Sequence, residues 1–307
     1  NDFSIMGVRF VSDAYIAQYT NLGQPVGNMV QGPDTTLYLV NAGIKMPFTS
    51  CSADVVDYGY TCASNQYVPL TIGQTNKLVS GPTVTKLIKS NSNGTIYYMN
   101  NGQKRPFPSW SDLVALHIPI SYNVLTSALV SNFPNGSVLY GPGRLVKTTS
   151  SATVYMVKNL SKLVPISSFV YPQDLGLSLD ILTISDNDLQ TYTLDSAIQT
   201  KVLCGTTDYV GTNGQNYDVT SSLSTYGFQS NQFIDGGSIC SNLPISSQNL
   251  GNYIRTSNGT IYYVSNGHKQ AVTNWNAYVA HGGSGANTVN VSNYFATLIA
   301  SGSDITQ

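Results

Sequence analysis

The acidic residues are the first candidates for chemistry, because glycoside hydrolysis usually needs two carboxylates of separated pKa beside the bond that is cut. All 15 acidic residues are Asp, and the sequence contains no Glu. No Asp recurs in the inner strands of the repeats described below. Asp186 and Asp188 lie where a helix is expected to begin, and there an acidic residue caps the helix and complements its dipole. The sequence therefore predicts a protein that is not an enzyme, with an Asp-dependent polysaccharide-cleaving enzyme as the less favoured alternative.

The histidines and the Gly-rich loops predict no metal or cofactor site. His117, His268 and His281 have neither the HExxH spacing nor any other paired metal-ligand spacing. The segment from His281 to Ser284 resembles an oxyanion loop beside a nucleophile, but the G-x-S-x-G turn is absent, which favours a surface loop. The acidic pair named above could begin a calcium loop, yet the Gly and the distal Glu of an EF-hand are missing. We expect no cofactor.

The four cysteines lie in two pairs along the chain. Cys51 is followed by Cys62, and Cys204 is followed at a longer distance by Cys240, so neither pair has the CxxC spacing of a zinc site. Of the three possible pairings we expect the two local disulfides, Cys51–Cys62 and Cys204–Cys240. The alternative is four buried free thiols in a cytosolic protein, which the low content of charged residues disfavours. Disulfides indicate an oxidising compartment.

Aromatic and amide side chains are the candidates for ligand binding, because aromatic faces cover the C–H surfaces of neutral sugars while amides and hydroxyls bind their oxygens. Trp110 and Trp275 occupy the same place in two repeats. We expect them, with His268, to lie at a glycan site, where Lys104 and Lys269 could meet anionic wall polymers. Two alternatives stay open: the Trp side chains pack between neighbouring repeats, and the Lys side chains protect a strand edge from pairing.

The composition disfavours two classes of partner. Charged residues make up 9% of the 307 residues, against about 25% in an average soluble domain. The net charge of −1 provides no basic field, so we expect no nucleic-acid partner. No apolar run approaches the roughly 18 residues of a membrane span, so we expect no membrane insertion in this segment. Because residue 1 is Asn, we expect a mature or excised chain.

A motif recurs five times, aligned without gaps on a Tyr that is followed by a Gly five residues later and a Lys seven residues later. The Tyr column, which we expect in the core, is Tyr38, Tyr97, Tyr155, Tyr209 and Tyr262. The Gly column is Gly43, Gly102, Leu160, Gly214 and Gly267. The Lys column is Lys45, Lys104, Lys162, Asn216 and Lys269. The third and fourth copies are therefore degenerate.

A second half of the unit follows further along the chain behind each Tyr. It is marked by V-S-D-like segments at Ser12, Ser185 and Ser292, and the span from the first to the last covers five equal periods. We expect a single repeat domain over residues 1–307. Its approximate repeats are 27–80, 81–135, 136–194, 195–248 and 249–307, and residues 1–26 would be the tail of a preceding or ring-closing repeat.

Each repeat is expected to begin with a three-stranded meander. The residues around the Tyr are mostly apolar, as in a strand that is buried on both faces. Asn101-Gly102 and Asn266-Gly267 supply the positive φ angles of tight hairpins. The tail, for example at Ser185, is typical of a Ser-capped helical turn.

A unit of about 56 residues cannot bury its own apolar faces, so neighbouring repeats must stack. The sequence therefore predicts an all-β fold of about five such repeats with short helical turns between blades. A β-propeller-like ring is favoured, because strand-rich units of this length are typical of propellers, and an open β-rich solenoid is the alternative.

The consensus (I/V)-Y-x-(V/M)-x-N-G-x-K-R-x-F-x-S, followed by V-S-D-x-x-(I/L)-x-x-Y, resembles repeats of bacterial secreted and cell-surface proteins, with the best match from Leu87 to Ser109. The resemblance implies an extracellular, wall-associated setting and supplies no ligand. Two functions follow as hypotheses. The first is a non-catalytic binding or adhesion module for surface or wall polysaccharide or a partner surface protein, and the second is a structural surface-layer or spacer domain.

Overall fold

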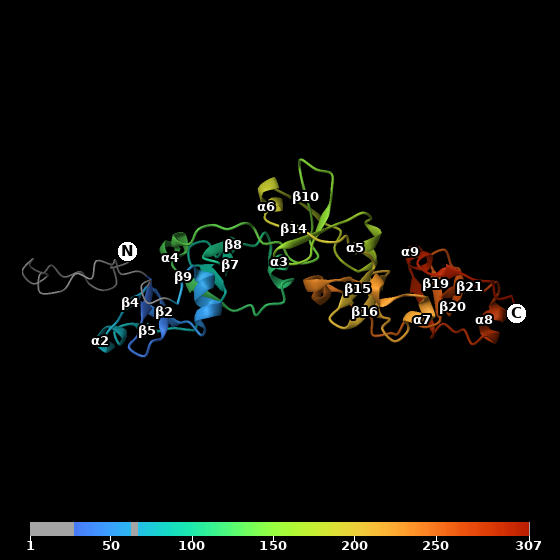
Figure 1. Cartoon of the computed structure of the whole chain (residues 1–307), viewed down its shortest axis with the longest axis horizontal. Helices are drawn as coiled ribbons and strands as arrows, with labels where there is room; N and C mark the ends of the chain where they lie inside the picture. The colour runs from blue at the N-terminus through green and yellow to red at the C-terminus, as the bar shows by residue number, and fades with distance from the viewer. Residues whose placement is uncertain (1–27, 63–66, 307) are drawn as a thin grey trace, which may run out of the picture. The chain divides into compact units, whose positions relative to one another are not determined.

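The computed structural model describes residues 28–62 and 67–306, which form five small β-sheets joined by short helices (Figure 1). The chain divides into two compact units, Asn1–Pro108 with Ile118–Leu139 and Ser109–His117 with Tyr140–Gln307. Two sheets lie in the first unit and three in the second. All strands of a given sheet come from one of the five repeat ranges given above.

The first unit holds two meanders and the short helices that follow them. Its strands are β1 (Met29–Gln31), β2 (Leu37–Asn41), β3 (Ile44–Pro47), β4 (Val68–Pro69), β5 (Val79–Ser80), β6 (Leu87–Ser90), β7 (Ile96–Asn100), β8 (Gln103–Pro106) and β9 (Tyr122–Leu125). Its helical segments are η1 (Cys51–Val55), η2 (Val56–Tyr58), α2 (Ile72–Thr75) and α4 (Ser127–Asn132).

The second unit holds the other three sheets and begins with a helix from the second repeat. Its strands are β10 (Leu145–Thr148), β11 (Tyr155–Val157), β12 (Lys162–Pro165), β13 (Ile181–Ile184), β14 (Thr193–Leu194), β15 (Lys201–Cys204), β16 (Thr207–Thr212), β17 (Gln215–Asp218), β18 (Ile234–Asp235), β19 (Tyr253–Thr256), β20 (Ile261–Ser265), β21 (His268–Ala271), β22 (Thr288–Val291) and β23 (Ala300–Ser301). Its helical segments are α3 (Trp110–Val114), α5 (Val170–Asp174), α6 (Asp186–Gln190), α7 (Leu223–Tyr226), η3 (Ser230–Gln232), η4 (Gly237–Asn242), α8 (Trp275–Ala280) and α9 (Asn293–Thr297).

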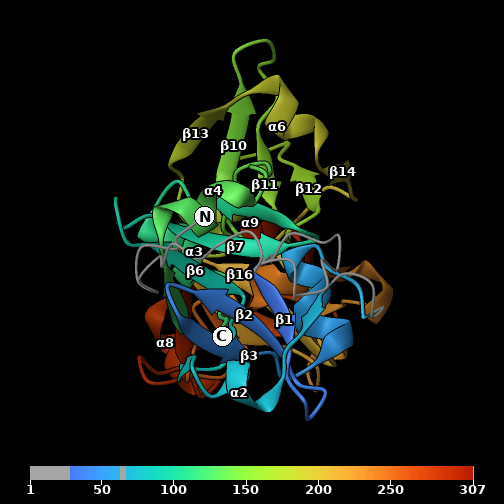
Figure 2. The ribbon, with the colours of Figure 1, turned by 90° about the vertical axis from the view of Figure 1, so that its left-hand side faces the viewer.

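The five sheets share one plan. Three consecutive strands form the expected antiparallel meander, and tail strands of the same repeat pair with it in parallel. In the third sheet the order is β13-β10-β11-β12-β14, and Figure 2 shows these strands side by side. In the second and fourth sheets the place beside the third strand is taken by a single bridge, Lys104 with Asn135 and Asn216 with Ile245. Each repeat is thus one mixed sheet closed by its own tail.

The hairpins lie where the Asn-Gly pairs predict them. Asn101 and Gly102 have φ angles of +48° and +76°, and Asn266 and Gly267 have +48° and +78°. Both residues are therefore in the left-handed region, as a two-residue turn with the twist of the flanking strands requires. The strands that contain the aligned Tyr residues begin at that Tyr or one or two residues before it. The prediction of a meander around each Tyr is confirmed.

Short helices begin at capping side chains, as the tail motif predicts. The Ser185 hydroxyl accepts a hydrogen bond from the Asp188 backbone N–H at 3.0 Å, and Ser292 does the same for Phe295 at 3.0 Å. Each hydroxyl satisfies a donor that the first helical turn leaves open. The matching tail segment at Ser12 lies outside the described residues.

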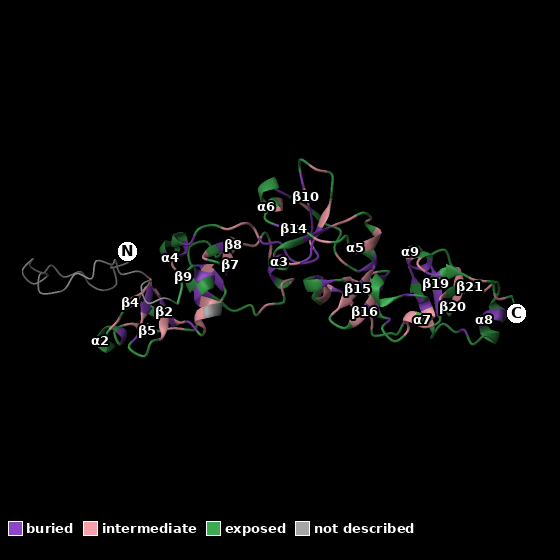
Figure 3. Ribbon diagram, viewed as in Figure 1, coloured by how far each residue is buried: buried purple, intermediate pink, exposed green. Residues whose placement is uncertain are grey.

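Apolar side chains of consecutive repeats share their cores. One core cluster combines Leu39 of the first repeat with Met99 of the second, and another combines Val210 of the fourth with Val264 of the fifth. All four side chains are fully buried. Figure 3 shows how burial is distributed over the elements. Buried segments lie along the strands, and helices such as α2 and α8 are mostly exposed. Stacking therefore supplies the burial that a single sheet lacks.

The fold is mostly β, as expected, but the predicted ring is not confirmed. The described strands form no closed barrel or propeller. The sheets also differ from propeller blades, which are sheets of four strands usually built as an antiparallel meander, because their outer strands run parallel to the meander strands beside them. This parallel pairing arises because the tail crosses over through a helix before it returns to the sheet.

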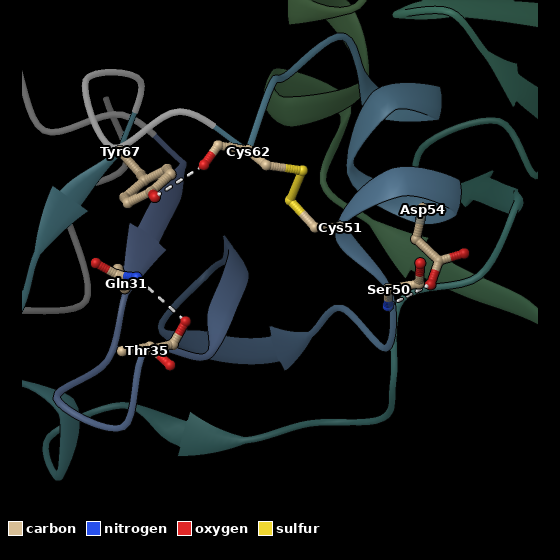
Figure 4. Close-up of a disulfide and its surroundings, with 7 residues drawn as sticks. All are labelled: Gln31, Thr35, Ser50, Cys51, Asp54, Cys62 and Tyr67. Atoms are coloured by element: carbon tan, nitrogen blue, oxygen red, sulfur yellow. Dashed lines mark hydrogen bonds between the residues drawn. A yellow bond between two sulfur atoms is a disulfide. The ribbon is translucent and has the colours of Figure 1, made fainter.

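Both expected disulfides are present. Cys51 pairs with Cys62 and Cys204 pairs with Cys240, each with 5.7 Å between the Cα atoms. The first connects the start of η1 to the loop that follows η2 (Figure 4). The second encloses the β16–β17 hairpin and α7 in one covalent loop. Two disulfides are consistent with a compartment outside the cytoplasm.

Candidate functional site

Trp275 is the most exposed aromatic side chain that lies over a supporting ring. It is the first residue of α8, and 67% of its surface is exposed. The Asn274 side chain caps this helix by accepting a hydrogen bond from the Ala277 N–H at 2.8 Å. The cap orders the backbone of the first turn, on which Trp275 stands.

A cluster of tyrosines supports the Trp275 ring from below. The Tyr278 ring lies one turn further along α8, with its centroid 5.0 Å from that of Trp275. Tyr278 is itself buried against Tyr253 in an edge-to-face contact at 5.3 Å, and its hydroxyl bonds the Thr288 hydroxyl at 2.5 Å. An exposed ring on a buried aromatic base presents a rigid apolar face with little conformational entropy to lose.

A shallow hollow of about 450 Å³ lies beside Trp275. Its lining residues are Asn258, Gly259, Thr260, Ile261, Val272, Asn274, Trp275 and Tyr278. The Asn258 carboxamide oxygen accepts bonds from the Thr256 hydroxyl and the Thr260 N–H, at 2.6 and 3.1 Å. This arrangement holds the amide at the edge of the hollow. The lining carries amides, hydroxyls and aromatic rings and no charged side chain.

Equivalent hollows occur in two other repeats. In the third repeat a hollow is lined by Thr153, Val154, Ile166 and Phe169, and Phe169 is 45% exposed where the helix begins. In the first repeat the equivalent hollow is lined by Thr36, Leu37, Phe48, Cys51, Cys62 and Tyr67. There the disulfide takes the place of the exposed ring, as Figure 4 shows beside Tyr67. The hollow therefore recurs in three of the five repeats, and the group that stands beside it differs among them.

A Thr column that the sequence analysis missed contributes one residue to each of these three hollows. Two residues before each aligned Tyr stand Thr36, Thr95, Thr153, Thr207 and Thr260. In four repeats the backbone N–H of this Thr bonds the side chain two residues earlier, on Asp34, Asn93, Ser151 and Asn258. A search for recurring columns on the upstream side of the Tyr would have found it, because the residue type is the same in all five copies.

Trp110 repeats the position of Trp275 with a different base. It is the first residue of α3, its N-cap is Ser109, and it is 58% exposed. The side chain one turn further along is Leu113, which is buried. The exposure of both Trp side chains disfavours the alternative that they pack between neighbouring repeats. Only Trp275, however, has an aromatic support.

The two lysines expected at the ligand site bond to backbone carbonyls instead. The Lys104 ammonium donates to the Phe133 carbonyl, and the Lys269 ammonium donates to the Ala296 and Ile299 carbonyls at 2.6 and 2.7 Å. These carbonyls lie at the C-terminal ends of α4 and α9. Burial lowers the pKa of both ammonium groups. We therefore leave both residues out of the site that we propose.

The same contacts explain the Lys column as a device of the fold. Lys45 makes the equivalent bond to the Thr75 carbonyl at the end of α2, at 3.0 Å. A cation at a helix C-terminus satisfies carbonyls that have no partner within the helix and complements the helix dipole. The strand-edge alternative does not hold for Lys45 or Lys269, because β3 pairs with β5 and β21 pairs with β23.

His268 is exposed on β21, with its Nδ1 atom 2.9 Å from the Asn266 carbonyl oxygen. It is not part of the hollow beside Trp275. The structure therefore brings together Trp275 and the hairpin at Asn258, and it does not bring His268 to them.

The carboxylates that the sequence singled out have structural partners. Asp188 accepts the Ser185 hydroxyl at 2.7 Å, and Asp186 accepts the Ser150 hydroxyl at 2.5 Å. In another hollow of the second unit, buried Asp112 is bonded by the Arg144 guanidinium at 3.2 Å. Among residues 28–62 and 67–306 no group of three or more His, Cys or acidic side chains could hold a metal ion.

The helices in the described part of the chain are all too short or too polar to cross a membrane. No family model and no curated protein matches the chain. The solved structures that match include the periplasmic assembly from the ESX-5 inner membrane complex, at 11% identity over 93% of this chain and 95% of that chain, with a TM-score of 0.19. The EccB3 dimer from the ESX-3 core complex matches at 10% identity over 90% of this chain and 97% of that chain, also with a TM-score of 0.19. TM-scores this low do not establish a common fold.

Proposed function

We propose that this chain is a non-catalytic, extracellular binding module that takes a neutral surface or wall polysaccharide in the hollow beside Trp275. The observation that carries the proposal is the exposed Trp275 ring, fixed on Tyr278 next to an edge of amides and hydroxyls. A pyranose presents an apolar C–H face and a rim of hydroxyls, and this hollow matches both. Phe169 beside Thr153 offers a second, weaker platform of the same kind in the third repeat.

The lack of charge in the lining supports a neutral ligand. An anionic polymer would be bound through cations and would lose affinity as salt screens them. The hollow contains no cation, and Lys269 of the same repeat bonds to carbonyls. We therefore expect the dissociation constant for a neutral glycan to change less than about twofold between 50 and 500 mM NaCl.

The two Trp residues allow a direct test by fluorescence. In the Trp110→Phe variant Trp275 is the only indole, so its emission reports on the hollow alone. Titration with soluble neutral polysaccharides identified on a glycan array should shift this emission. Trp275→Ala should weaken binding by roughly tenfold or more, as expected for loss of an aromatic anchor, with no change in melting temperature beyond a few degrees. Trp110→Ala is the matched control on the other exposed indole.

Three results would contradict the proposal. One is the absence of binding to any neutral glycan, and another is equal affinity of wild type and Trp275→Ala. The third is release of reducing ends from the bound polysaccharide, which would make the protein an enzyme. Unfolding of Trp275→Ala would show that the indole is needed for the fold, and the fluorescence titration of Trp110→Phe would then decide the question alone.

A structural spacer or surface-layer domain is the second candidate. Direct backbone hydrogen bonds between consecutive repeats, such as the Gly267 N–H to the Thr225 carbonyl at 3.0 Å, favour it.

A further inference from the structure

The helix after each meander ends in the same left-handed turn. In four repeats the residue in this turn is a glycine: Gly59, Gly176, Gly227 and Gly282, with φ angles of +82°, +75°, +71° and +84°. Its N–H donates to the carbonyl three residues earlier, at 2.9, 3.0, 3.3 and 3.0 Å in chain order. The next N–H closes on the carbonyl five residues before it in all four cases. Gly282 therefore ends α8 with the geometry that the other three glycines have.

In three of these repeats the helix end accepts the hairpin of the next repeat. The carbonyl two residues before the glycine accepts the N–H of a hairpin Gly from the following meander. The three bonds are Gly102 to Asp57 at 2.9 Å, Gly214 to Asp174 at 3.1 Å and Gly267 to Thr225 at 3.0 Å. The first joint lies in the first unit and the other two lie in the second. We call this contact the glycine joint.

The glycine joint leaves no space for a side chain on the helix-end residue. A Cβ on Gly59 would lie 2.8 Å from the Gly102 Cα, and one on Gly227 would lie 2.9 Å from the Gly267 Cα. At Gly176 the nearest atom would be the Gly214 carbonyl oxygen, at 2.4 Å. Since all three distances are below van der Waals contact, only glycine allows the two backbones to meet.

The second repeat uses another donor for the same carbonyl. His117 stands in the left-handed position with a φ of +50°, and the Ala115 carbonyl accepts a bond from the Asn242 side chain at 3.0 Å. The third repeat, whose hairpin would follow, has Leu160 in place of the hairpin Gly. In all of the first four repeats this carbonyl is therefore bonded.

In the fifth repeat the acceptor half of the joint has no donor within the described part of the chain. No N–H or other donor reaches the Ala280 carbonyl among the described residues, and a Cβ on Gly282 would meet no atom within 4 Å. The first repeat has the donor half. Ala42 and Gly43 have φ angles of +50° and +79°, close to the +48° and +76° of Asn101 and Gly102. A Cβ on Gly43 would also meet no described atom within 4 Å.

We propose that the end of α8 at Gly282 is a docking surface for the Ala42–Gly43 hairpin of a second copy of this chain. The Gly43 N–H of one copy donates to the Ala280 carbonyl of the other, and Gly282 packs on Gly43 as in the three internal joints. The two surfaces differ, so the contact is heterologous, and each added copy again offers one free half of each kind. Within one chain, the two halves of a joint meet at an effective concentration of about 1 mM or more. We therefore expect separate copies to associate at protein concentrations in the same range.

Asparagine substitution separates the joint from the fold. Asn tolerates a positive φ, and the space at Gly282 and Gly43 is open, so Gly282→Asn and Gly43→Asn should keep the melting temperature within a few degrees of wild type. The added side chain blocks the close approach of backbones. Gly205→Asn is the matched control, because Gly205 has a φ of +65° and open space in the β15–β16 hairpin, which forms neither half of the joint.

Analytical ultracentrifugation of the 307-residue chain between about 10 μM and 1 mM tests the proposal. The mean mass of wild type and Gly205→Asn should rise with concentration, while Gly282→Asn and Gly43→Asn should each stay monomeric. An equimolar mixture of these two variants should stop at a heterodimer, because it contains one intact half of each kind. Wild type that stays monomeric throughout this range, or Gly282→Asn that associates like wild type, would overturn the proposal.

Amide chemical shifts give a second readout that does not depend on the variants. In wild type the Gly43 and Gly282 amide signals should move with concentration, while the Gly205 signal should not. Self-association without movement of the Gly43 signal would overturn the proposal even if an Asn variant failed to fold. Because neither Gly43 nor Gly282 lines the hollow beside Trp275, glycan binding by the monomeric variants remains measurable and decides the other proposal separately.

Discussion

The Ser292 hydroxyl donates a hydrogen bond of 2.6 Å to the Asp174 carboxylate, although the two residues are 118 positions apart. Asp174 ends α5 of the third repeat, and Ser292 caps α9 of the fifth. The other carboxylate oxygen accepts the Asn213 N–H at 3.1 Å. One buried side chain thus links three repeats of the second unit.

Burial raises the pKa of the Asp174 carboxyl, against the two hydrogen bonds that lower it. A carboxyl whose pKa is higher in the folded state contributes stability below its unfolded pKa of about 4, and this contribution is lost as pH rises through the folded pKa. The difference in unfolding free energy between wild type and Asp174→Asn should therefore be larger at pH 4 than at pH 7. Urea denaturation at both pH values measures it. An unchanged difference would show that Asp174 titrates normally.

Asp195 should show the opposite dependence on pH. It accepts bonds from the Lys158 and Lys162 ammonium groups at 2.9 and 3.2 Å, and these bonds, with the Ser196 N–H, hold its pKa well below the usual range. Its contribution to stability is present above the unfolded pKa of about 4 and is lost as pH falls through the lowered folded pKa. Asp195→Asn should cost about 1–3 kcal/mol at pH 7 and less at pH 3.

Exposed Asp304→Asn is the control for both carboxylates and should leave the unfolding free energy unchanged within about 0.5 kcal/mol at each pH. A cost of Asp195→Asn that grew as pH fell would contradict the expected sign.

Lys104→Met should destabilise the first unit by about 1–3 kcal/mol. Lys104 is 8% exposed, and its ammonium satisfies the carbonyl that ends α4. Methionine has a similar length and leaves that carbonyl without its charged donor. Exposed Lys77→Met in the same unit is the control, with an expected change below about 0.5 kcal/mol. Equal urea midpoints for the two variants would show that the bond adds nothing.

Loss of the Cys204–Cys240 disulfide should cost more than loss of Cys51–Cys62. In the chain-entropy model, closing a loop of 36 residues stabilises by about 3.8 kcal/mol, and closing one of 11 residues by about 2.8 kcal/mol. Paired Cys→Ser variants compared by chemical denaturation measure both values. A larger cost for the shorter loop would show that local packing, rather than loop closure, decides the difference.

The sequence by itself determined the features that depend on neighbouring residues. Asn-Gly pairs require positive φ angles and therefore predict hairpins at Asn101 and Asn266 without knowledge of the rest of the chain. Ser185 and Ser292 predict helix starts for the same local reason. The repeat register and the pairing of both disulfides also followed, because a short loop favours the partner that is near in sequence.

Only the tertiary structure decided what each repeated side chain does. Lys104 and Lys269 cap helices of their own tails, a role that no spacing shows, because the tail returns to the meander in three dimensions. The parallel outer strands arise from the same return. Exposure of Trp275, rather than burial between repeats, depends on where neighbouring repeats make contact. They do so through helix-end glycines such as Gly227. The role of these glycines follows from the short distance between two backbones, which the sequence alone does not show.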